Sequence, residues 1–322
     1  MKAVIHTNYG PPEVLQLQEV EKPQPNDDQL LIKVFATTVT SGEVKIRSFK
    51  NIPKLFWLPA RLNFGLFKPK NKMLGNEFSG VVESIGKNVK SFKPGDKVFG
   101  FYLFGANAEY FCVPEKAAVT TIPGNFTFEE AAAIPFGALN ALFFLKAGKI
   151  NKGDKVLVAG SSGAVGVYAV QLTKYFGADV TATCSTKNVE LVKSLGADSV
   201  IDYTKEDVSK NGKVYDIIFD TVGATKYSHI KNSLTKNGKY ILIVFAGKEL
   251  LQMMWNSMFS SKKIICTVSS EKKEDIEFLS GLMQQGKLKP VIDKKYPLEK
   301  IVDAHTYVET GHKRGAVVIN VV

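Results

Sequence analysis

Residues 155–166 read KVLVAGSSGAVG, a mostly apolar run followed at once by a turn sequence with three spaced glycines. The run predicts a strand over Lys155–Ala159, and the apolar spacing beyond it predicts a helix over 164–176. A strand that feeds the amino terminus of a helix presents free N–H groups and a positive dipole end to a phosphate. Glycines let the backbone turn tightly and approach the ligand. The stretch therefore predicts a dinucleotide-binding turn. Its spacing is G-x-x-G-x-x-G rather than G-x-G-x-x-G, and an ordinary glycine-rich turn in a ligand-free sheet is the alternative.

On the carboxyl-terminal side of this turn, strand patterns alternate with helix patterns. Strands are expected at 179–183, 199–202, 215–220, 239–244 and 263–269, with helices at 188–195 and 271–285. Strands that are apolar throughout are buried on both faces, and their alternation with helices is typical of a doubly wound parallel sheet. We therefore predict a Rossmann domain over 124–286.

The residues before 124 contain short strand patterns separated by turn chemistry. The strands are expected at 2–6, 29–34, 79–84, 97–100 and 109–113, and the turns at 10–12, 22–25 and 93–96. The last segment, RGAVVINVV at 314–322, is a further strand that needs a sheet to join. Its return to the first sheet would give a discontinuous β-rich domain, made of 1–123 and 287–322.

The end of the second Rossmann strand indicates which dinucleotide binds. In NAD-binding proteins an Asp or Glu about 20 residues beyond the glycines holds the ribose 2′-hydroxyl. This chain has Ser185, Thr186 and Lys187 there and no carboxylate. Hydroxyls and a cation suit a 2′-phosphate, so we predict NADP as the cofactor. The alternative is that Lys187 is only a surface cation at the start of a helix.

Composition indicates the cellular compartment and the classes of partner. Cys112, Cys184 and Cys266 are far apart and odd in number, which predicts no disulfide framework and suits a reducing compartment. The first residues lack the apolar core of a secretory signal, and no apolar run approaches a membrane span of about 18 residues. We therefore expect a cytoplasmic protein. The net charge of +11 comes from dispersed lysines, which indicates a solvated surface that attracts an anionic cofactor and no nucleic-acid partner.

Several motifs resemble the medium-chain dehydrogenase/reductase superfamily along nearly the whole chain. Residues 75–89, GNEFSGVVESIGKNV, are similar to the G-H-E-x-x-G-x-x-x-x-x-G-x-x-V signature of its zinc alcohol dehydrogenases. Residues 92–98, FKPGDKV, are similar to the turn and strand that follow, and the opening 2–15 resembles quinone-reductase-like members. The resemblance implies an α/β protein in which a GroES-like, β-rich catalytic domain accompanies the Rossmann domain.

The chain departs from the zinc enzymes at their metal ligands. Asn76 stands where the signature has a ligand histidine, and Thr40-Ser41-Gly42-Glu43 stands where the zinc enzymes have C-G-x-D. Zinc sites require thiolate or imidazole ligands, and the cysteines and histidines fall in no ligand spacing, so we predict no metal. Without a Lewis acid, the resemblance implies hydride transfer to a quinone or an α,β-unsaturated carbonyl compound. The alternatives are a zinc-independent carbonyl reductase or alcohol dehydrogenase, and a non-catalytic NADPH-binding sensor.

The resemblance also suggests which side chains face the reacting groups. Thr40 and Lys45 replace an Asn and a Tyr of the family; Thr40 is expected to hydrogen-bond an acceptor carbonyl, and Lys45 to polarise one or to pair with Glu43. Asn140 falls near a nicotinamide-facing threonine, and Tyr203 near the adenine-ribose phosphate. Packing or a surface role is the alternative for each. With the loop expected to hold the carboxamide, the predicted cofactor set is Gly160, Ser161, Ser162, Gly163, Ala164, Val165, Gly166, Ser185, Thr186, Lys187, Tyr203, Val222, Val244, Phe245 and Ala246.

Two further segments have unusual composition. Residues 49–72, FKNIPKLFWLPARLNFGLFKPKNK, are dense in aromatics and cations. They form an insert that packs on the domain, a lid over the site of a bulky apolar acceptor, or an attachment to an anionic membrane surface. Residues 250–259, LLQMMWNSMF, line the same pocket or belong to the core or a subunit contact. The resemblance implies that the strand at 263–269 pairs with its copy, which predicts a homodimer.

Overall fold

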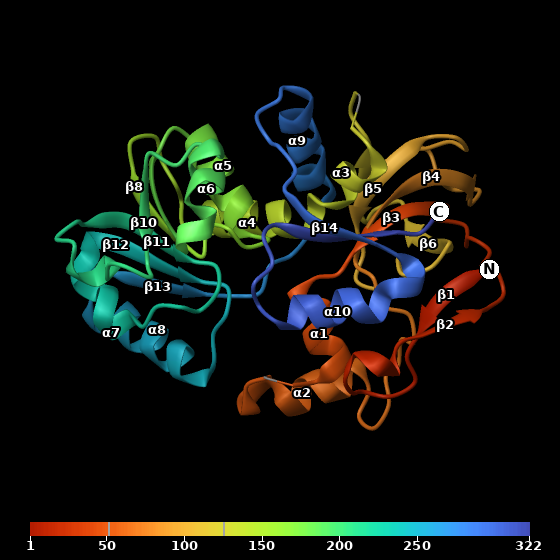
Figure 1. Cartoon of the computed structure of the whole chain (residues 1–322), viewed down its shortest axis with the longest axis horizontal. Helices are drawn as coiled ribbons and strands as arrows, with labels where there is room; N and C mark the ends of the chain where they lie inside the picture. Colours follow the sequence, from red (N-terminus) through yellow and green to blue (C-terminus); the bar gives the residue numbers. More distant parts are fainter. Residues whose placement is uncertain (51, 125) are drawn as a thin grey trace. The chain divides into compact units, whose positions relative to one another are not determined.

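The computed structural model describes residues 1–50, 52–124 and 126–322. They form two compact units, Met1–Leu139 with Glu271–Val322, and Asn140–Ser270 (Figure 1). The boundaries differ from those expected at 123 and 286. Helix α3 (Phe128–Ala132) packs on the sheet of the first unit, and α9 (Lys273–Gln284) packs against its last antiparallel strand. Of the segment 49–72, Asn51 lies outside the described residues.

The first unit is built on a seven-stranded sheet in the order β14-β15-β3-β4-β5-β7, with β6 pairing to β3. A separate antiparallel pair is formed by β1 and β2. Strand β15 pairs antiparallel with β3 and parallel with β14, so the carboxyl-terminal run joins the sheet of the amino-terminal residues. The strands are β1 (Lys2–Ile5), β2 (Gln16–Glu19), β3 (Gln29–Thr38), β4 (Glu77–Ile85), β5 (Lys97–Phe101), β6 (Tyr110–Pro114), β7 (Ala118–Thr121), β14 (Ile292–Pro297) and β15 (Ala316–Asn320).

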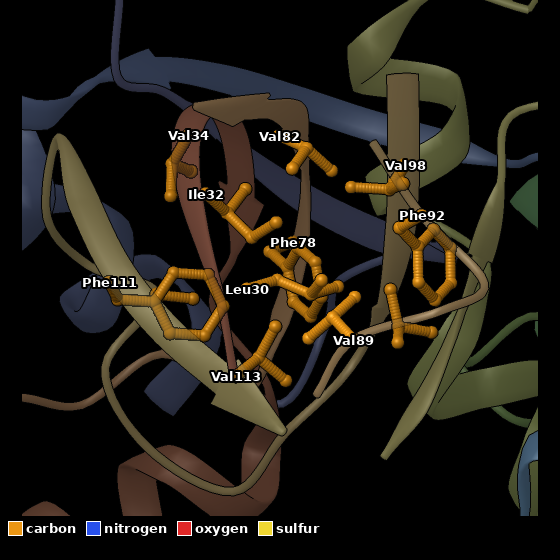
Figure 2. Close-up of a cluster of buried hydrophobic side chains, with 12 residues drawn as sticks. Leu30, Ile32, Val34, Phe78, Val82, Val89, Phe92, Val98, Phe111 and Val113 are labelled. Carbon is orange, nitrogen blue, oxygen red and sulfur yellow. The ribbon is translucent and has the colours of Figure 1, made fainter. Parts of the chain in front are cut away.

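Alternating residues of these strands form the core of the first unit (Figure 2). Leu30, Ile32 and Val34 of β3 point to one face because side chains along a strand alternate with a period of two. They pack against Phe78 of β4 and Phe111 of β6, whose rings meet edge to face with centroids 4.8 Å apart. The pattern that predicted these strands is therefore the pattern that buries them.

Two helices of this unit begin at residues whose side chains cap them. Thr127 and Glu130 form a capping box at the start of α3, with reciprocal bonds of 3.2 and 2.9 Å. Thr40 caps the amino terminus of α1 (Ser41–Ser48), a cap that the sequence analysis did not predict. The remaining helices of the unit are α2 (Lys54–Phe64) and α10 (Ile301–Glu309).

The second unit is a doubly wound parallel sheet in the order β10-β9-β8-β11-β12-β13, which confirms the predicted fold class. In Figure 1, α5 and α6 lie on one side of it and α7 and α8 on the other. Its elements are α4 (Pro135–Ala147, which begins in the first unit), β8 (Lys155–Ala159), α5 (Gly166–Tyr175), β9 (Asp179–Cys184), α6 (Val189–Ser194), β10 (Ser199–Asp202), β11 (Tyr215–Asp220), α7 (Tyr227–Ile230), β12 (Leu234–Leu242), α8 (Gly247–Phe259) and β13 (Lys263–Cys266).

Some predicted bounds were wrong. Helix α5 begins at Gly166 rather than at 164, because the two residues before it belong to the turn. Strand β12 starts earlier and ends earlier than 239–244, since Leu234 already pairs with Tyr215 of β11. Strand β13 ends at Cys266 and not at 269, where its pairing to β12 stops.

The expectation that no apolar run approaches a membrane span was also wrong. Among the described residues, Phe128–Ala147 is long and apolar enough to cross a membrane by length and composition. However, 72% of its most apolar window is buried inside the protein. Packing within the protein accounts for this apolar character.

We expect Phe78→Ala to lower the free energy of unfolding by about 3–5 kcal/mol, because it leaves a cavity among the β3, β4 and β6 side chains. Urea denaturation followed by circular dichroism measures the change. Leu17→Ala is the matched control, since Leu17 is 37% exposed on β2 and surface truncations shift stability by about 0.5 kcal/mol or less. Equal effects of the two substitutions would contradict the assignment of this core.

Candidate functional site

The glycine-rich turn after β8 folds back on itself before α5 begins. Gly160 has a positive φ of 78°, which favours glycine. The Ser161 N–H donates to the Thr183 carbonyl of β9 at 3.0 Å, and the Gly163 N–H donates to the Gly160 carbonyl at 3.0 Å. The Ser161 hydroxyl is buried and donates to the Val158 carbonyl at 2.7 Å. Ser161 therefore holds the turn through its side chain, and a ligand would meet its neighbours instead.

The three glycines of the turn have different surroundings. A Cβ at Gly160 would lie 2.6 Å from a methyl of Val222, and a Cβ at Gly166 would lie 2.1 Å from the Gly160 carbonyl oxygen. Both are shorter than real contacts allow. A Cβ at Gly163 would lie 3.4 Å from the same oxygen and 3.9 Å from Val222. Gly160 and Gly166 are therefore required by the fold, whereas Gly163 leaves open space above the turn.

The loop after β11 is held beside this turn by Asp220, a residue whose role the sequence analysis missed. Its buried carboxylate accepts the N–H groups of Val222, Gly223 and Ala224 at 3.0, 2.7 and 3.2 Å. Val222, half exposed, is thereby fixed against Gly160. A Cβ at Gly223 would lie 3.2 Å from Cβ of Val244, which follows β12. The loops after β8, β11 and β12 thus meet at one edge of the sheet, and Phe245 and Ala246 continue the last of them.

The loop after β9 is joined to the glycine turn by Asn188, which the sequence analysis also missed. Its side-chain amide donates to the Ser162 hydroxyl at 3.0 Å and to the Ser185 hydroxyl at 3.3 Å. Both predicted hydroxyls therefore lie together at the carboxyl edge of the sheet. Cys184 precedes them and is buried. Burial raises the pKa of its thiol to about 11, so it remains a protonated packing group.

A carboxylate that the sequence analysis did not anticipate lies next to the predicted 2′-phosphate contacts. Asp202, the last residue of β10, accepts the Thr186 hydroxyl at 2.5 Å and the Thr204 hydroxyl at 2.7 Å. These hydroxyls lower the pKa of Asp202 to about 2. Lys187 and Tyr203 are exposed beside it. The sheet brings Asp202 here from the neighbouring strand, so the subsite contains a negative charge as well as the predicted cation.

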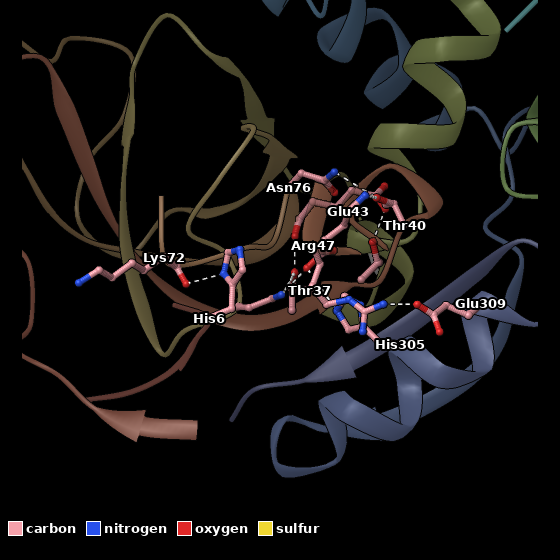
Figure 3. Close-up of polar contacts among 12 residues, drawn as sticks. His6, Thr37, Thr40, Glu43, Arg47, Lys72, Asn76, His305 and Glu309 are labelled. Carbon is pink, nitrogen blue, oxygen red and sulfur yellow. Dashed lines mark hydrogen bonds and ion pairs between the residues drawn. The ribbon is translucent and has the colours of Figure 1, made fainter. Parts of the chain in front are cut away.

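In the first unit, Thr40 lies at the start of α1 within a buried polar cluster (Figure 3). Its hydroxyl oxygen accepts the Glu43 N–H at 3.1 Å and the Asn76 side-chain amide at 3.1 Å. Its own proton donates to no group among the described residues. Lys45, in contrast, is exposed, so α1 does not bring the two candidate residues together. Asn140, the third predicted catalytic residue, is buried on α4.

Glu43 does not pair with Lys45 but points into the cluster. Its carboxylate accepts the Asn107 amide at 2.5 Å and lies 3.6 Å from Nε2 of His305. Arg47, fully buried, forms an ion pair with Glu309. Further buried polar atoms here have no hydrogen-bond partner in the described part of the chain: His6 Nε2, Glu43 Oε2, Arg47 Nε, Arg47 Nη1, Asn76 Oδ1, His305 Nδ1 and His305 Nε2. The cluster therefore places a carboxylate, a guanidinium and an imidazole in the interior of the first unit.

The same cluster shows how the chain fills the position of a dehydrogenase zinc site. A hydroxyl and an amide, Thr40 and Asn76, bond to each other there, and neither is a zinc ligand of the usual kind. Among the residues that the structure describes, no group of three or more His, Cys, Asp and Glu side chains is arranged to hold a metal ion. The donor set therefore does not fit zinc.

Glu77 extends the cluster toward α4. Its carboxylate accepts the Phe136 N–H at 2.6 Å and the hydroxyl of Thr38. Burial raises the pKa of Glu77 to about 7, although these hydrogen-bond donors and the charge of Lys313 lower it. Burial therefore favours the protonated form of this carboxyl group, which lies one residue from Asn76.

Comparisons with known proteins agree along the whole chain. Residues 26–124 match the alcohol dehydrogenase GroES-like domain, and 195–319 match the zinc-binding dehydrogenase family. A chloroplastic quinone oxidoreductase of Triphysaria versicolor is 35% identical over 99% of this chain and 98% of its own. The chloroplastic NADPH-dependent alkenal/one oxidoreductase of Arabidopsis thaliana is 32% identical over 99% of this chain and 79% of its own. The quinone oxidoreductase structure from Coxiella burnetii has a TM-score of 0.88 at 29% identity, covering 100% of this chain and 99% of that one.

We expect Gly163→Ala and Gly166→Ala to separate the ligand role of the turn from its structural role. The first should keep the melting temperature and weaken dinucleotide binding about tenfold or more, since the added methyl fits the turn but fills the approach of a phosphate. The second should lower the melting temperature, because its Cβ collides with the Gly160 carbonyl. Calorimetric titration with NADPH and thermal unfolding measure the two effects. Unchanged NADPH affinity in Gly163→Ala would contradict the phosphate role.

Proposed function

Because the chain belongs to the quinone oxidoreductases and alkenal/one reductases of the medium-chain dehydrogenase/reductase family, we propose that it transfers a hydride from NADPH to a quinone or an α,β-unsaturated carbonyl compound. The observation that carries the proposal is the Thr40–Asn76 hydrogen bond, at the position where the zinc alcohol dehydrogenases of the superfamily have metal ligands. A site with these two groups does not activate an alcohol by a metal. It suits an acceptor that is already electrophilic.

The nucleotide is assigned to the carboxyl edge of the parallel sheet. When bound, NADPH supplies the hydride. The turn from Gly160 to Gly166 offers N–H groups at the start of α5 to the pyrophosphate. Val222 and Val244 are the apolar groups beside it, and Asp220 holds the first of them in place. These residues fit a dinucleotide because Gly163, whose missing Cβ would meet only ordinary contacts at 3.4 and 3.9 Å, lets a phosphate approach the backbone of the turn.

Thr40 is the residue proposed to act on the acceptor. Hydride addition to an enone or a quinone develops negative charge on a carbonyl oxygen, and a donor aimed at that oxygen stabilises the transition state. A hydroxyl has two acceptor positions and one proton. Both acceptor positions of Thr40 are taken by Glu43 and Asn76, so its proton is the group left for the acceptor. Lys45 stays a second candidate for the same role.

The preference for NADPH over NADH is a finer part of the proposal. Lys187 and the hydroxyls of Ser185 and Thr186 favour a 2′-phosphate. Asp202 favours the alternative, because a carboxylate at this edge repels phosphate and accepts a ribose hydroxyl. Its bond to Thr186 and its 3.6 Å ion pair with Lys205 offset part of this charge. We propose NADPH, with Asp202 limiting the selectivity.

The activity test is NADPH oxidation with a panel of quinones and enones. We expect turnover that resists a metal chelator, and a loss of about 10²-fold in kcat/KM for Thr40→Val, the size of effect seen when a transition-state donor is removed. Thr40→Ser keeps the hydroxyl and is the matched control. NADPH binding without turnover on any acceptor would favour a sensor, and turnover with saturated aldehydes or ketones alone would favour a carbonyl reductase.

Two substitutions test the cofactor preference in opposite directions. Lys187→Ala should lower the ratio of NADPH to NADH specificity about tenfold, because one charge-assisted contact to the phosphate is lost. Asp202→Asn should raise the same ratio, since it removes the repelling charge. Initial rates with each nucleotide measure both. If Asp202→Asn instead abolishes a preference for NADH, the carboxylate holds the ribose hydroxyl and the chain is an NADH enzyme.

A further inference from the structure

Helix α2 has a row of leucines that the fold leaves uncovered. Leu55, Leu58 and Leu62 are 60%, 53% and 58% exposed. Their spacing of three and four residues puts them on one side of the helix. The loop that follows continues the apolar surface with Leu66, 41% exposed, and Phe67, 86% exposed. We call these five residues the α2 apolar face.

Arg61, Phe64 and Gly65 connect α2 and the residue after it to the rest of the first unit. The guanidinium of Arg61 lies over the ring of Tyr9 at 4.1 Å and over that of Phe49 at 4.2 Å. The Tyr9 hydroxyl donates to the Gly65 carbonyl at 2.9 Å, and Phe64 meets Phe104 edge to face with ring centroids 6.1 Å apart. These contacts fix which side of the helix points outward. No residue within α2 is buried, and these contacts orient the helix while its leucines remain exposed.

Positive charge surrounds this apolar face. Between Glu43 and Glu77 the sequence contains no Asp or Glu and eight basic residues: Lys45, Arg47, Lys50, Lys54, Arg61, Lys68, Lys70 and Lys72. Arg47 and Arg61 are committed to contacts inside the unit. The six lysines are exposed. The Lys70 ammonium donates to the Leu62 carbonyl at 2.7 Å, which keeps one cation beside the leucine row.

A second exposed apolar helix in the chain lacks this charge pattern. In α8, Trp255 and Met258 are 68% and 74% exposed. That helix contains one lysine, Lys248, and one glutamate, Glu249, and the segment from its end to Glu271 adds only Lys262 and Lys263. Apolar exposure alone therefore does not distinguish α2, whereas the combination of an apolar face and a border of cations does.

We propose that α2 and the loop through Lys72 bind the surface of a bilayer that contains anionic lipids. The leucines and Phe67 would enter the interface between headgroups and acyl chains, and the lysines would contact lipid phosphates. A helix with one apolar side and basic flanks is suited to such a surface, and charge attraction strengthens the binding. The proposal goes beyond the hydride transfer proposed above and does not depend on it.

The test is co-sedimentation of the full chain with vesicles of phosphatidylcholine, alone or mixed with phosphatidylglycerol. We expect binding to the mixed vesicles that falls as salt is added. Leu58→Glu with Leu62→Glu should lower the partition coefficient about tenfold or more, and Lys68→Gln with Lys70→Gln and Lys72→Gln about 10²-fold. The matched control is Trp255→Glu with Met258→Glu on α8, which should leave vesicle binding unchanged. Melting temperatures show that each variant is folded.

Three outcomes would overturn the proposal. The first is no binding of the folded wild-type chain to the mixed vesicles. The second is vesicle binding that the α2 substitutions leave unchanged or that the α8 control abolishes. The third is a self-associated wild-type chain that Leu58→Glu with Leu62→Glu converts to monomer, which would assign the α2 apolar face to a second copy of the protein.

Discussion

The steric demand at Gly160 is the constraint on which the nucleotide-binding half of the molecule depends. A side chain there would collide with Val222, and one at Gly166 would collide with the carbonyl of Gly160 itself. The turn can therefore close only with glycine at both positions. Because it closes, α5 starts directly above the end of β8, and the loops of the neighbouring strands meet at that point. The order of the strands places this meeting at the reversal of the sheet, where doubly wound folds bind ligands.

In the first unit, the buried polar residues near Thr40 are the corresponding constraint. Burial of polar groups costs free energy unless they are hydrogen-bonded, yet His305, Arg47 and Asn76 are all buried near Thr40. A fold selected for stability alone would replace them by apolar groups of similar volume. Their presence around Thr40 agrees with a site that tunes one hydroxyl and the Glu77 carboxyl without a metal. In this chain, Thr40 and Asn76, a hydroxyl and an amide, bond to each other where the resemblance to the zinc alcohol dehydrogenases predicts metal ligands.

The exposed apolar faces follow a different logic from the two sites. The fully buried core residues of the two units include none from α2, and α8 adds only the partly buried Leu250 and Met253 to the core of the second unit. The outward side chains of both helices remain in contact with water. Surfaces of this kind are costly for solubility and mark contacts with other molecules. On α2, the exposed lysines of the same segment favour the anionic lipid surface that we propose as its partner. Although basic residues are dispersed over the whole chain, in the segment between Glu43 and Glu77 they accompany exposed apolar surface and no acidic residue.

The sequence by itself determined the elements that local physics controls. The run KVLVA and the glycines after it predicted β8 and its turn, because periodicity and turn chemistry act between near neighbours. It also identified the family. The tertiary structure alone decided which distant residues meet. Asp202 reaches Thr186 from a neighbouring strand, Asp220 fixes the loop beside Gly160, and Thr40 bonds Asn76 across 36 positions of sequence. No single-sequence pattern encodes these pairs, since strand order and side-chain direction in the folded sheet create them.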